Sequence, residues 1–175
     1  CQAFMTELQG HRGEDIDVPA GDIGVGPREI GYLFGQWKRM TNAFTGVLTG
    51  KGMEYGGSPV RTEATGYGVV YMLQDMLEHA GMALDGKRVL VSGSGNVAQF
   101  AIEKALEHGA RGITFSDSEG FVHDPDGVDG ERLAWLKALK NERRGRVREY
   151  AEPFGVDFHD GRKPWDIEAQ VALPC

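Results

Sequence analysis

The sequence is poor in cysteine, in long apolar runs and in excess positive charge, and each shortage excludes a class of protein. Its two cysteines, Cys1 and Cys175, stand at opposite ends, so neither a disulfide framework nor a cysteine-based metal site is expected. No apolar run approaches the ~20 residues of a membrane span. The net charge of −7 opposes a nucleic-acid partner, which normally needs a basic surface. We therefore expect no metal, no membrane and no nucleic acid, but small-molecule partners and a reducing, cytoplasmic location.

Glycine is abundant instead, with 26 of 175 residues, about twice the usual ~7%. The glycines cluster in particular turns, which indicates sites where backbone geometry is critical. The chain opens without a methionine and stops directly after an apolar run, so both ends are expected to be internal points of a longer chain.

Hydrophobic periodicity predicts alternating strands and helices, hence an α/β fold. Helices are expected at residues 1–8, 27–40, 63–80, 97–107 and 130–141. Strands are expected at residues 15–18, 87–92, 113–115, 156–158 and 170–173. In the helix at 63–80, the pattern places Val69, Met72, Leu73 and Met76 on one buried face.

A glycine motif, Gly93-Ser94-Gly95-Asn96-Val97-Ala98, lies between a buried strand and a helix. It matches G-x-G-x-x-A, in which the first glycine allows a tight turn and the second admits a pyrophosphate to the helix N-terminus. A purely structural strand-to-helix turn is the alternative. Asp117 ends the next strand, where an acidic residue would meet the adenosine ribose, although Asp117 could also be an ordinary turn residue.

The residues around Asp117 bear on the choice of dinucleotide. An acid there usually accepts from the 2′-hydroxyl of NAD and would repel a 2′-phosphate. Ser118, however, could donate to a phosphate, and a basic cluster follows at the end of the next helix, Lys140, Arg143, Arg144 and Arg146. This cluster could equally be a solvated helix C-terminus.

Four longer strings are distinctive together, the segments 18–24, 50–52, 61–68 and 92–98. In order and spacing over nearly the whole chain they resemble hexameric glutamate dehydrogenases, especially the small-subunit, NADP-preferring bacterial type. The resemblance implies a Rossmann-like, doubly wound dinucleotide-binding domain at residues 58–175, incomplete at its C-terminal end. Residues 1–57 would be the C-terminal part of an α/β substrate and dimerisation domain. The implied reaction is reversible oxidative deamination of L-glutamate to 2-oxoglutarate and ammonium with NADP, in a homohexamer of nitrogen metabolism.

The resemblance also assigns roles to single residues. Asp22 matches the catalytic aspartate that moves a proton to or from the substrate nitrogen, although its string alone would also suit a loop-turning residue. Gly21 matches a substrate contact and Thr65 a cofactor contact near the nicotinamide. The remaining cofactor residues are Gly93, Ser94, Gly95, Asn96 and Val97 in the glycine turn, Asp117 and Ser118 at the ribose, and Lys140 and Arg146, which accompany NADP preference.

Important parts of the family pattern fall outside this sequence. The substrate-binding and catalytic lysines of the family would precede Cys1, and Lys51 belongs to a different string, so the chain alone is expected to be inactive. A leucine, phenylalanine or valine dehydrogenase is the nearest enzymatic alternative. A non-catalytic nucleotide-binding module is another, but it would have no use for Asp22.

Overall fold

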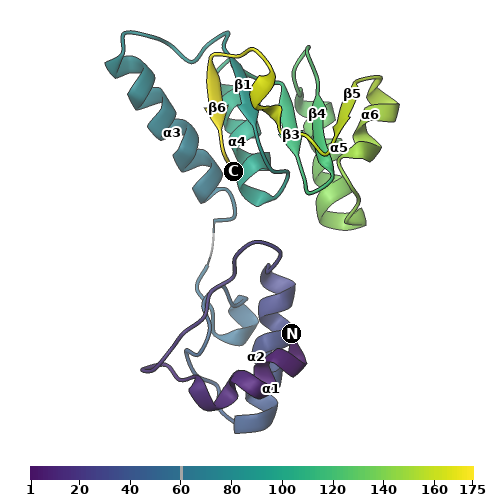
Figure 1. Cartoon of the computed structure of the whole chain (residues 1–175). Coiled ribbons are helices and arrows are strands. Elements are labelled where there is room, and N and C mark those ends of the chain that lie inside the picture. The colour runs from purple at the N-terminus through teal and green to yellow at the C-terminus, as the bar shows by residue number, and fades with distance from the viewer. Residues whose placement is uncertain (60) are drawn as a thin grey trace. The chain divides into compact units, whose positions relative to one another are not determined.

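The computed structural model describes residues 1–59 and 61–175, which form two compact units, Cys1–Arg61 and Thr62–Cys175 (Figure 1). The boundary predicted between residues 57 and 58 lies inside the first unit. Each unit has its own apolar core, and each is described by itself below.

The first unit is helical. Its elements are α1 (Gln2–Leu8), η1 (Gln9–His11), α2 (Pro27–Thr41) and η2 (Met53–Tyr55). Helix α2 begins where Pro27 supplies a helical φ angle and the Glu29 carboxylate accepts from the Gly26 backbone N–H at 3.0 Å. The helix predicted at residues 27–40 is confirmed, and four apolar residues at helical spacing form its buried face, Ile30, Leu33, Phe34 and Trp37. They pack with Met5, Val47 and Leu48.

The strand predicted at residues 15–18 is wrong. The structure has only an isolated antiparallel bridge between Gly13 and Asp17, supported by an ion pair of 2.7 Å between Arg12 and Asp17. Alternation stabilises a strand only when one face is buried against a partner, and the Ile16 side chain is 76% exposed. The segment is therefore a loop on the surface of the unit.

The second unit contains two small sheets. Strands β1 (Arg88–Val91), β2 (Arg111–Gly112) and β6 (Val171–Leu173) form a parallel sheet in the order β2-β1-β6. Strands β3 (Thr114–Ser116), β4 (Gly120–His123) and β5 (Asp157–Asp160) form an antiparallel sheet in the order β3-β4-β5. The two sheets are connected, because β2 runs on through Ile113 into β3, and the Ile113 N–H donates to the Val89 carbonyl at 3.0 Å.

The helices of this unit pack on the strands or on one another, as Figure 1 shows for α4 behind β1. They are α3 (Ala64–His79), α4 (Asn96–Glu107), α5 (Gly130–Lys137) with a π-helical turn (Ala138–Arg143), α6 (Arg148–Phe154) and the short η4 (Pro164–Asp166). Because β1, α4 and β2 form a β-α-β unit with parallel strands, the predicted α/β alternation is confirmed here. Strand β4 and helix α6 were not predicted from the sequence.

The buried face predicted for α3 is only partly right. Met72 and Met76 are 61% and 60% exposed, while Val70 and Leu77 are buried and Val69 and Leu73 pack against the core. Apolar residues occur around most of this helix, so periodicity alone selects no single face. Gly66 determines which face of α3 is buried, because its lack of a side chain lets that face approach α4 closely. Within residues 1–59 and 61–175, no helix has the length and apolar character needed to cross a bilayer.

Candidate functional site: a dinucleotide-binding turn and an aspartate loop

The glycine turn connects the end of β1 to α4. Gly93 has φ +76°, a conformation that suits glycine, and a Cβ atom there would lie 2.6 Å from the Cys175 carbonyl oxygen. The Gly93 N–H donates to the Ser116 hydroxyl, and the Ser116 N–H donates to the Gly93 carbonyl, both at 2.9 Å. The turn is thereby held beside the end of β3, where the ribose-binding residues are expected.

The N-terminus of α4 has free space around it and, among the described residues, uncapped backbone N–H groups, which a bound phosphate group requires. Gly95 is its N-cap residue, a Cβ atom at Gly95 would meet nothing within 4 Å, and no side chain in the described part of the chain caps this helix end. Ala98 is buried against the turn, and the Gln99 side chain holds the Ser94 carbonyl at 2.8 Å. First-turn N–H groups and the positive end of the helix dipole therefore fit a pyrophosphate.

The start of α3 lies beside the start of α4. The Asn96 side-chain amide donates to the Thr62 carbonyl at 2.6 Å. One turn further, a Cβ atom on Gly66 would lie 2.7 Å from the Val97 carbonyl, so the two helices are in close contact. Thr65, in the first turn of α3, is exposed next to these residues. The structure thus brings Thr65 and Asn96 to the same end of the helix pair as the glycine turn.

Asp117 and Ser118 follow β3 and meet the basic residues predicted at the ribose. Lys140 Nζ lies 3.8 Å from the Asp117 carboxylate, and the Arg146 guanidinium donates to the Ser118 hydroxyl at 3.1 Å. Arg146 Nε is also 3.3 Å from the Glu119 carboxylate. Four of the predicted cofactor residues therefore gather at one place, in contact with one another.

Two other arginines of the basic cluster serve the fold. Arg143 places its guanidinium carbon 4.5 Å from the centre of the Trp135 ring. Arg144 ends the π-helical turn in a left-handed conformation with φ 56°. The cluster is therefore more than a solvated helix end, because Lys140 and Arg146 reach Asp117 and Ser118.

The predicted substrate residues, Gly21 and Asp22, lie in the loop before α2, in the first unit. The Asp22 carbonyl accepts from the Val25 N–H at 2.8 Å, and a Cβ atom on Gly21 would lie 2.6 Å from the Val25 carbonyl oxygen. Gly21 thus allows a tight loop that only a residue without a side chain permits. The Asp22 residue is exposed, so its carboxylate is accessible to a ligand.

Lys51 is buried inside the first unit and is not exposed beside the loop that contains Asp22. The residue is 7% exposed, Nζ donates to the Thr45 carbonyl at 3.0 Å and lies 4.8 Å from the centre of the Phe34 ring. A carbonyl acceptor and an aromatic face compensate for the buried ammonium. Lys51 therefore stabilises the first unit from inside, as expected for a residue that does not replace the family's substrate lysines.

A buried polar network in the second unit, at the end of β3 opposite to Asp117, was missed by sequence reasoning. The Asp124 carboxylate, fully buried, accepts from Arg132 at 2.6 and 2.7 Å and from the Tyr150 hydroxyl at 3.0 Å. Burial, with the nearby Asp124 charge, raises the pKa of Tyr150 above its ordinary value. Asp124 stands in a His-Asp-Pro-Asp-Gly string that reads as a turn, so no sequence signal marked its burial.

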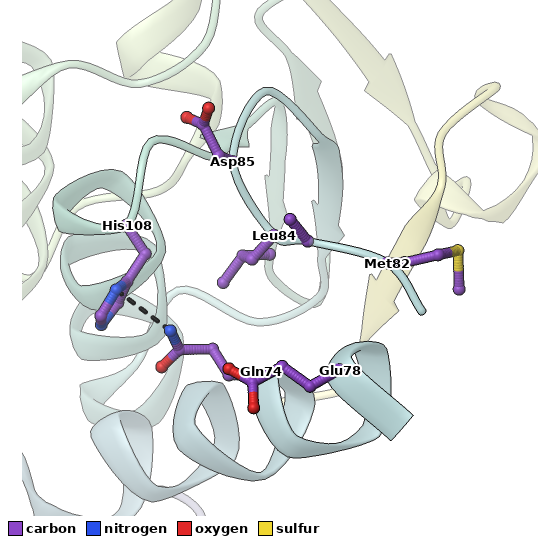
Figure 2. Close-up of a pocket in the computed structure, with 7 residues that line it drawn as sticks. Gln74, Glu78, Met82, Leu84, Asp85 and His108 are labelled. Atoms are coloured by element: carbon purple, nitrogen blue, oxygen red, sulfur yellow. Dashed lines mark hydrogen bonds between the residues drawn. The ribbon is translucent and has the colours of Figure 1, made fainter. Parts of the chain in front are cut away.

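A pocket in the second unit lies away from the glycine turn. It has a volume of about 210 Å³ and lies between the C-terminal ends of α3 and α4, where Gln74 contacts His108 at 3.1 Å (Figure 2). The glycine turn is at the opposite end of α4, and twelve helical residues span about 18 Å. The pocket therefore does not belong to the candidate dinucleotide site.

Comparison with family models decides the family. The model described as "Glutamate/Leucine/Phenylalanine/Valine dehydrogenase" matches residues 56–175, and "Glu/Leu/Phe/Val dehydrogenase, dimerisation domain" matches residues 1–39. The chain belongs to the Glu/Leu/Phe/Val dehydrogenase family. This match confirms the predicted α/β fold class, and the relatives below confirm the predicted resemblance to glutamate dehydrogenases.

Individual members of the dehydrogenase family are similar over the whole chain. An "NAD(P)-specific glutamate dehydrogenase" of Xylanibacter ruminicola is 59% identical over 100% of this chain and 39% of its own length. An "NADP-specific glutamate dehydrogenase" of Giardia intestinalis is 58% identical over 100% of this chain and 40% of its own length. The crystal structure of Plasmodium falciparum glutamate dehydrogenase superposes with a TM-score of 0.85 at 46% identity, over 100% of this chain and 38% of that one. The chain thus spans about two-fifths of the length of its relatives.

Proposed function

We propose that the whole protein containing this chain is a glutamate dehydrogenase that interconverts L-glutamate with 2-oxoglutarate and ammonium, using NADP. The observation that carries the proposal is the adenosine end of the site, where Ser118, Lys140 and Arg146 gather beside Asp117 in a chain 58% identical to an NADP-specific glutamate dehydrogenase. A hydroxyl donor and two cations suit a 2′-phosphate.

Residues of the second unit would hold the dinucleotide along its length. The turn Gly93–Val97 would hold the pyrophosphate through backbone N–H groups at the start of α4. Thr65 would lie toward the nicotinamide, since α3 begins beside that turn. The bound cofactor supplies the hydride acceptor or donor.

The proton chemistry is assigned to Asp22 in the first unit. Its carboxylate would give a proton to the substrate nitrogen or take one from it, while the Gly21 backbone contacts the substrate. Accessibility of the carboxylate and its placement in a tight, glycine-bounded loop support this role. The substrate-binding lysines expected from the family would come from outside this chain, so the chain alone is expected to bind a dinucleotide without turning it over.

The proposal also covers the domain organisation, the oligomeric state and the location of the protein. Residues 1–57 would be the C-terminal part of the substrate and dimerisation domain, and residues 58–175 would be the Rossmann-like dinucleotide domain. The match of residues 1–39 to a dimerisation domain supports a homo-oligomer, proposed as a hexamer. A cytoplasmic location is proposed from the scarcity of cysteine.

A substrate and cofactor matrix tests the proposed function. The whole protein would be assayed with glutamate, leucine, phenylalanine and valine, each with NADP and with NAD. We expect kcat/KM for glutamate with NADP to exceed every other pair by about 100-fold or more, because mismatched side chains leave polar groups unpaired. A higher value with leucine, phenylalanine or valine would contradict the proposal, and dinucleotide binding without any turnover would favour the non-catalytic alternative.

A further inference from the structure

Asp117 stands at the position where an acidic residue commonly accepts a hydrogen bond from a ribose hydroxyl. We propose that Asp117 is instead a positioning residue, which holds the loop 144–147 and Lys140 in the arrangement that receives the adenosine 2′-phosphate. This inference rests on the proposed function and extends it. An aspartate at this position would ordinarily disfavour NADP, whereas here Asp117 would favour NADP by positioning the residues that bind its 2′-phosphate.

The hydrogen bonds of Asp117 carry the inference. One carboxylate oxygen, Oδ1, accepts from the Glu119 backbone N–H at 2.9 Å. The other, Oδ2, accepts from the Val147 backbone N–H at 3.0 Å, across 30 residues of sequence. The side chain is only 9% exposed. Both oxygens therefore have protein donors, and little of the carboxylate remains accessible to a ribose.

The charge of Asp117 is compensated within the protein. Lys140 Nζ lies 3.8 Å from Oδ2 and also donates to the Gly145 carbonyl at 2.8 Å. One lysine thus contacts both the aspartate and the loop. A carboxylate whose charge is compensated by a neighbouring cation repels a nearby phosphate less than an uncompensated one would.

The loop 144–147 depends on this contact. Val147 is fully buried, and its N–H points to Asp117, while its neighbour Arg146 reaches the Ser118 hydroxyl at 3.1 Å. Arg144 and Gly145 reverse the chain after the π-helical turn, and the Arg146 N–H donates to the Glu149 carboxylate at 2.7 Å. Removing the Asp117 acceptor would therefore release the backbone that places the Arg146 guanidinium.

The test uses binding of two cofactor fragments to the whole protein, so that no turnover is needed. Titration calorimetry with 2′,5′-ADP and with 5′-AMP would compare the wild type with Asp117→Asn. We expect Asp117→Asn to weaken 2′,5′-ADP by about tenfold or more, the scale of one lost charged hydrogen bond, with less than a threefold change for 5′-AMP. Hydrogen exchange at the Val147 amide should become faster.

A second variant removes the other partner of the same bond. Val147→Pro deletes the N–H donor and replaces a buried valine side chain with another apolar one, at a residue whose φ of −61° proline can adopt. It should reproduce the selective loss of 2′,5′-ADP. The 5′-AMP titration reports any general loss of structure that the changed side chain causes. As a matched control, Glu119→Gln keeps the Glu119 N–H but removes a negative charge 3.3 Å from Arg146, so 2′,5′-ADP should bind as tightly as before or more tightly.

The outcomes separate the two proposals. If Asp117→Asn binds 2′,5′-ADP more tightly and 5′-AMP more weakly, Asp117 is a ribose acceptor and the inference is overturned, while the NADP assignment stands. Wild-type affinity in Val147→Pro, or equal losses for both ligands in Asp117→Asn, would also overturn it. If the wild type itself prefers 5′-AMP, the NADP assignment and the inference both fail.

Discussion

Asp22 is the single residue on which the proposed chemistry depends most. Asp22→Asn keeps the size of the side chain but removes the proton-accepting carboxylate. In the whole protein we expect turnover to fall by about 100-fold or more, the usual contribution of a general acid or base, with NADP affinity within about twofold of the wild type. Steady-state kinetics with titration calorimetry would check this.

Asp15→Asn is the matched control for that experiment, because Asp15 is another exposed aspartate of the same unit. It should leave turnover unchanged. Near-normal turnover in Asp22→Asn would remove Asp22 from the catalytic assignment.

Tyr67 offers a prediction about pH. Its hydroxyl donates to the Glu103 carboxylate at 2.6 Å, and this hydrogen bond, with burial and the Glu103 charge, raises the pKa of Tyr67 to about 12. Because folding raises the pKa above its ordinary value of ~10, the contact contributes stability fully below about pH 10 and loses it as the pH rises through the folded-state value.

Ultraviolet titration of tyrosine would measure this. We expect one tyrosine to ionise near pH 12 in the folded protein, Tyr67→Phe to delete that step, and Glu103→Gln to move it to lower pH. If Glu103→Gln left every step in place, the hydrogen bond would not be the cause of the raised pKa.

At the residue scale, sequence patterns located most of the candidate site but not its contacts. Gly93 was recognisable because its positive φ favours glycine in a strand-to-helix turn, and Gly95 because the G-x-G-x-x-A spacing places it at the start of the helix, where a missing side chain leaves the N-terminus open. The partners of Asp117 were not, because Val147 contributes only its backbone N–H, and no side-chain pattern reports which N–H reaches a carboxylate. The Asp124 network was missed for a similar reason, since its three members are far apart in the sequence.

At the scale of elements, the contact between α3 and α4 depends on a glycine. A Cβ atom on Gly66 would lie 2.6 Å from the Phe100 Cβ atom and 2.9 Å from the Ala101 backbone nitrogen. Backbone atoms cannot move aside cheaply, so Gly66→Ala should separate the helices and cost about 1–3 kcal/mol of unfolding free energy. Chemical denaturation would measure it.

Gly68 on the same helix is the matched control, because a Cβ atom there would meet nothing within 4 Å. Gly68→Ala should stabilise the protein by up to about 1 kcal/mol, since alanine is the better helix former. The two substitutions are chemically identical and have opposite expected signs. Equal effects would show that packing against α4 does not govern Gly66.

Helices and strands were predicted best where the hydrophobic pattern of the segment matched the side chains that the fold buries. Helix α2 and strand β1 were found because each has a clear period or a continuous apolar run. Strand β4 was hidden because only three residues separate it from β3, and its residues 120–123 begin with a glycine at φ +159°. Helix α6 contains Pro153, and a proline inside a segment argues against a helix there. The helix tolerates it because Pro153 is the next-to-last residue, where its missing N–H removes only a hydrogen bond of the last turn.

At the scale of the whole molecule, the two apolar cores predict two unfolding transitions. Asp124→Asn leaves Arg132 and the Tyr150 hydroxyl without their charged, buried partner, which should cost the second unit about 3 kcal/mol. Trp135 packs against the second core, whereas Trp37 is buried in the first. Fluorescence of variants that retain either Trp37 or Trp135 would follow the units separately.

The expected result is an earlier transition for Trp135 and an unchanged one for Trp37. A shift of both reporters by the same amount would mean that the chain unfolds as a single cooperative unit. Unchanged transitions for both would show that the Asp124 network contributes little to stability.

The division of the second unit into a parallel and an antiparallel sheet has a consequence for protein engineering. The parallel sheet carries the turn proposed for the pyrophosphate, which both dinucleotides share, whereas the antiparallel sheet and its helices carry the residues around Asp117 that would distinguish them. A mutant library confined to residues 117–149 would therefore vary cofactor choice while leaving the shared phosphate-binding turn intact. Selection for a new coenzyme could then proceed in one contiguous stretch of the gene.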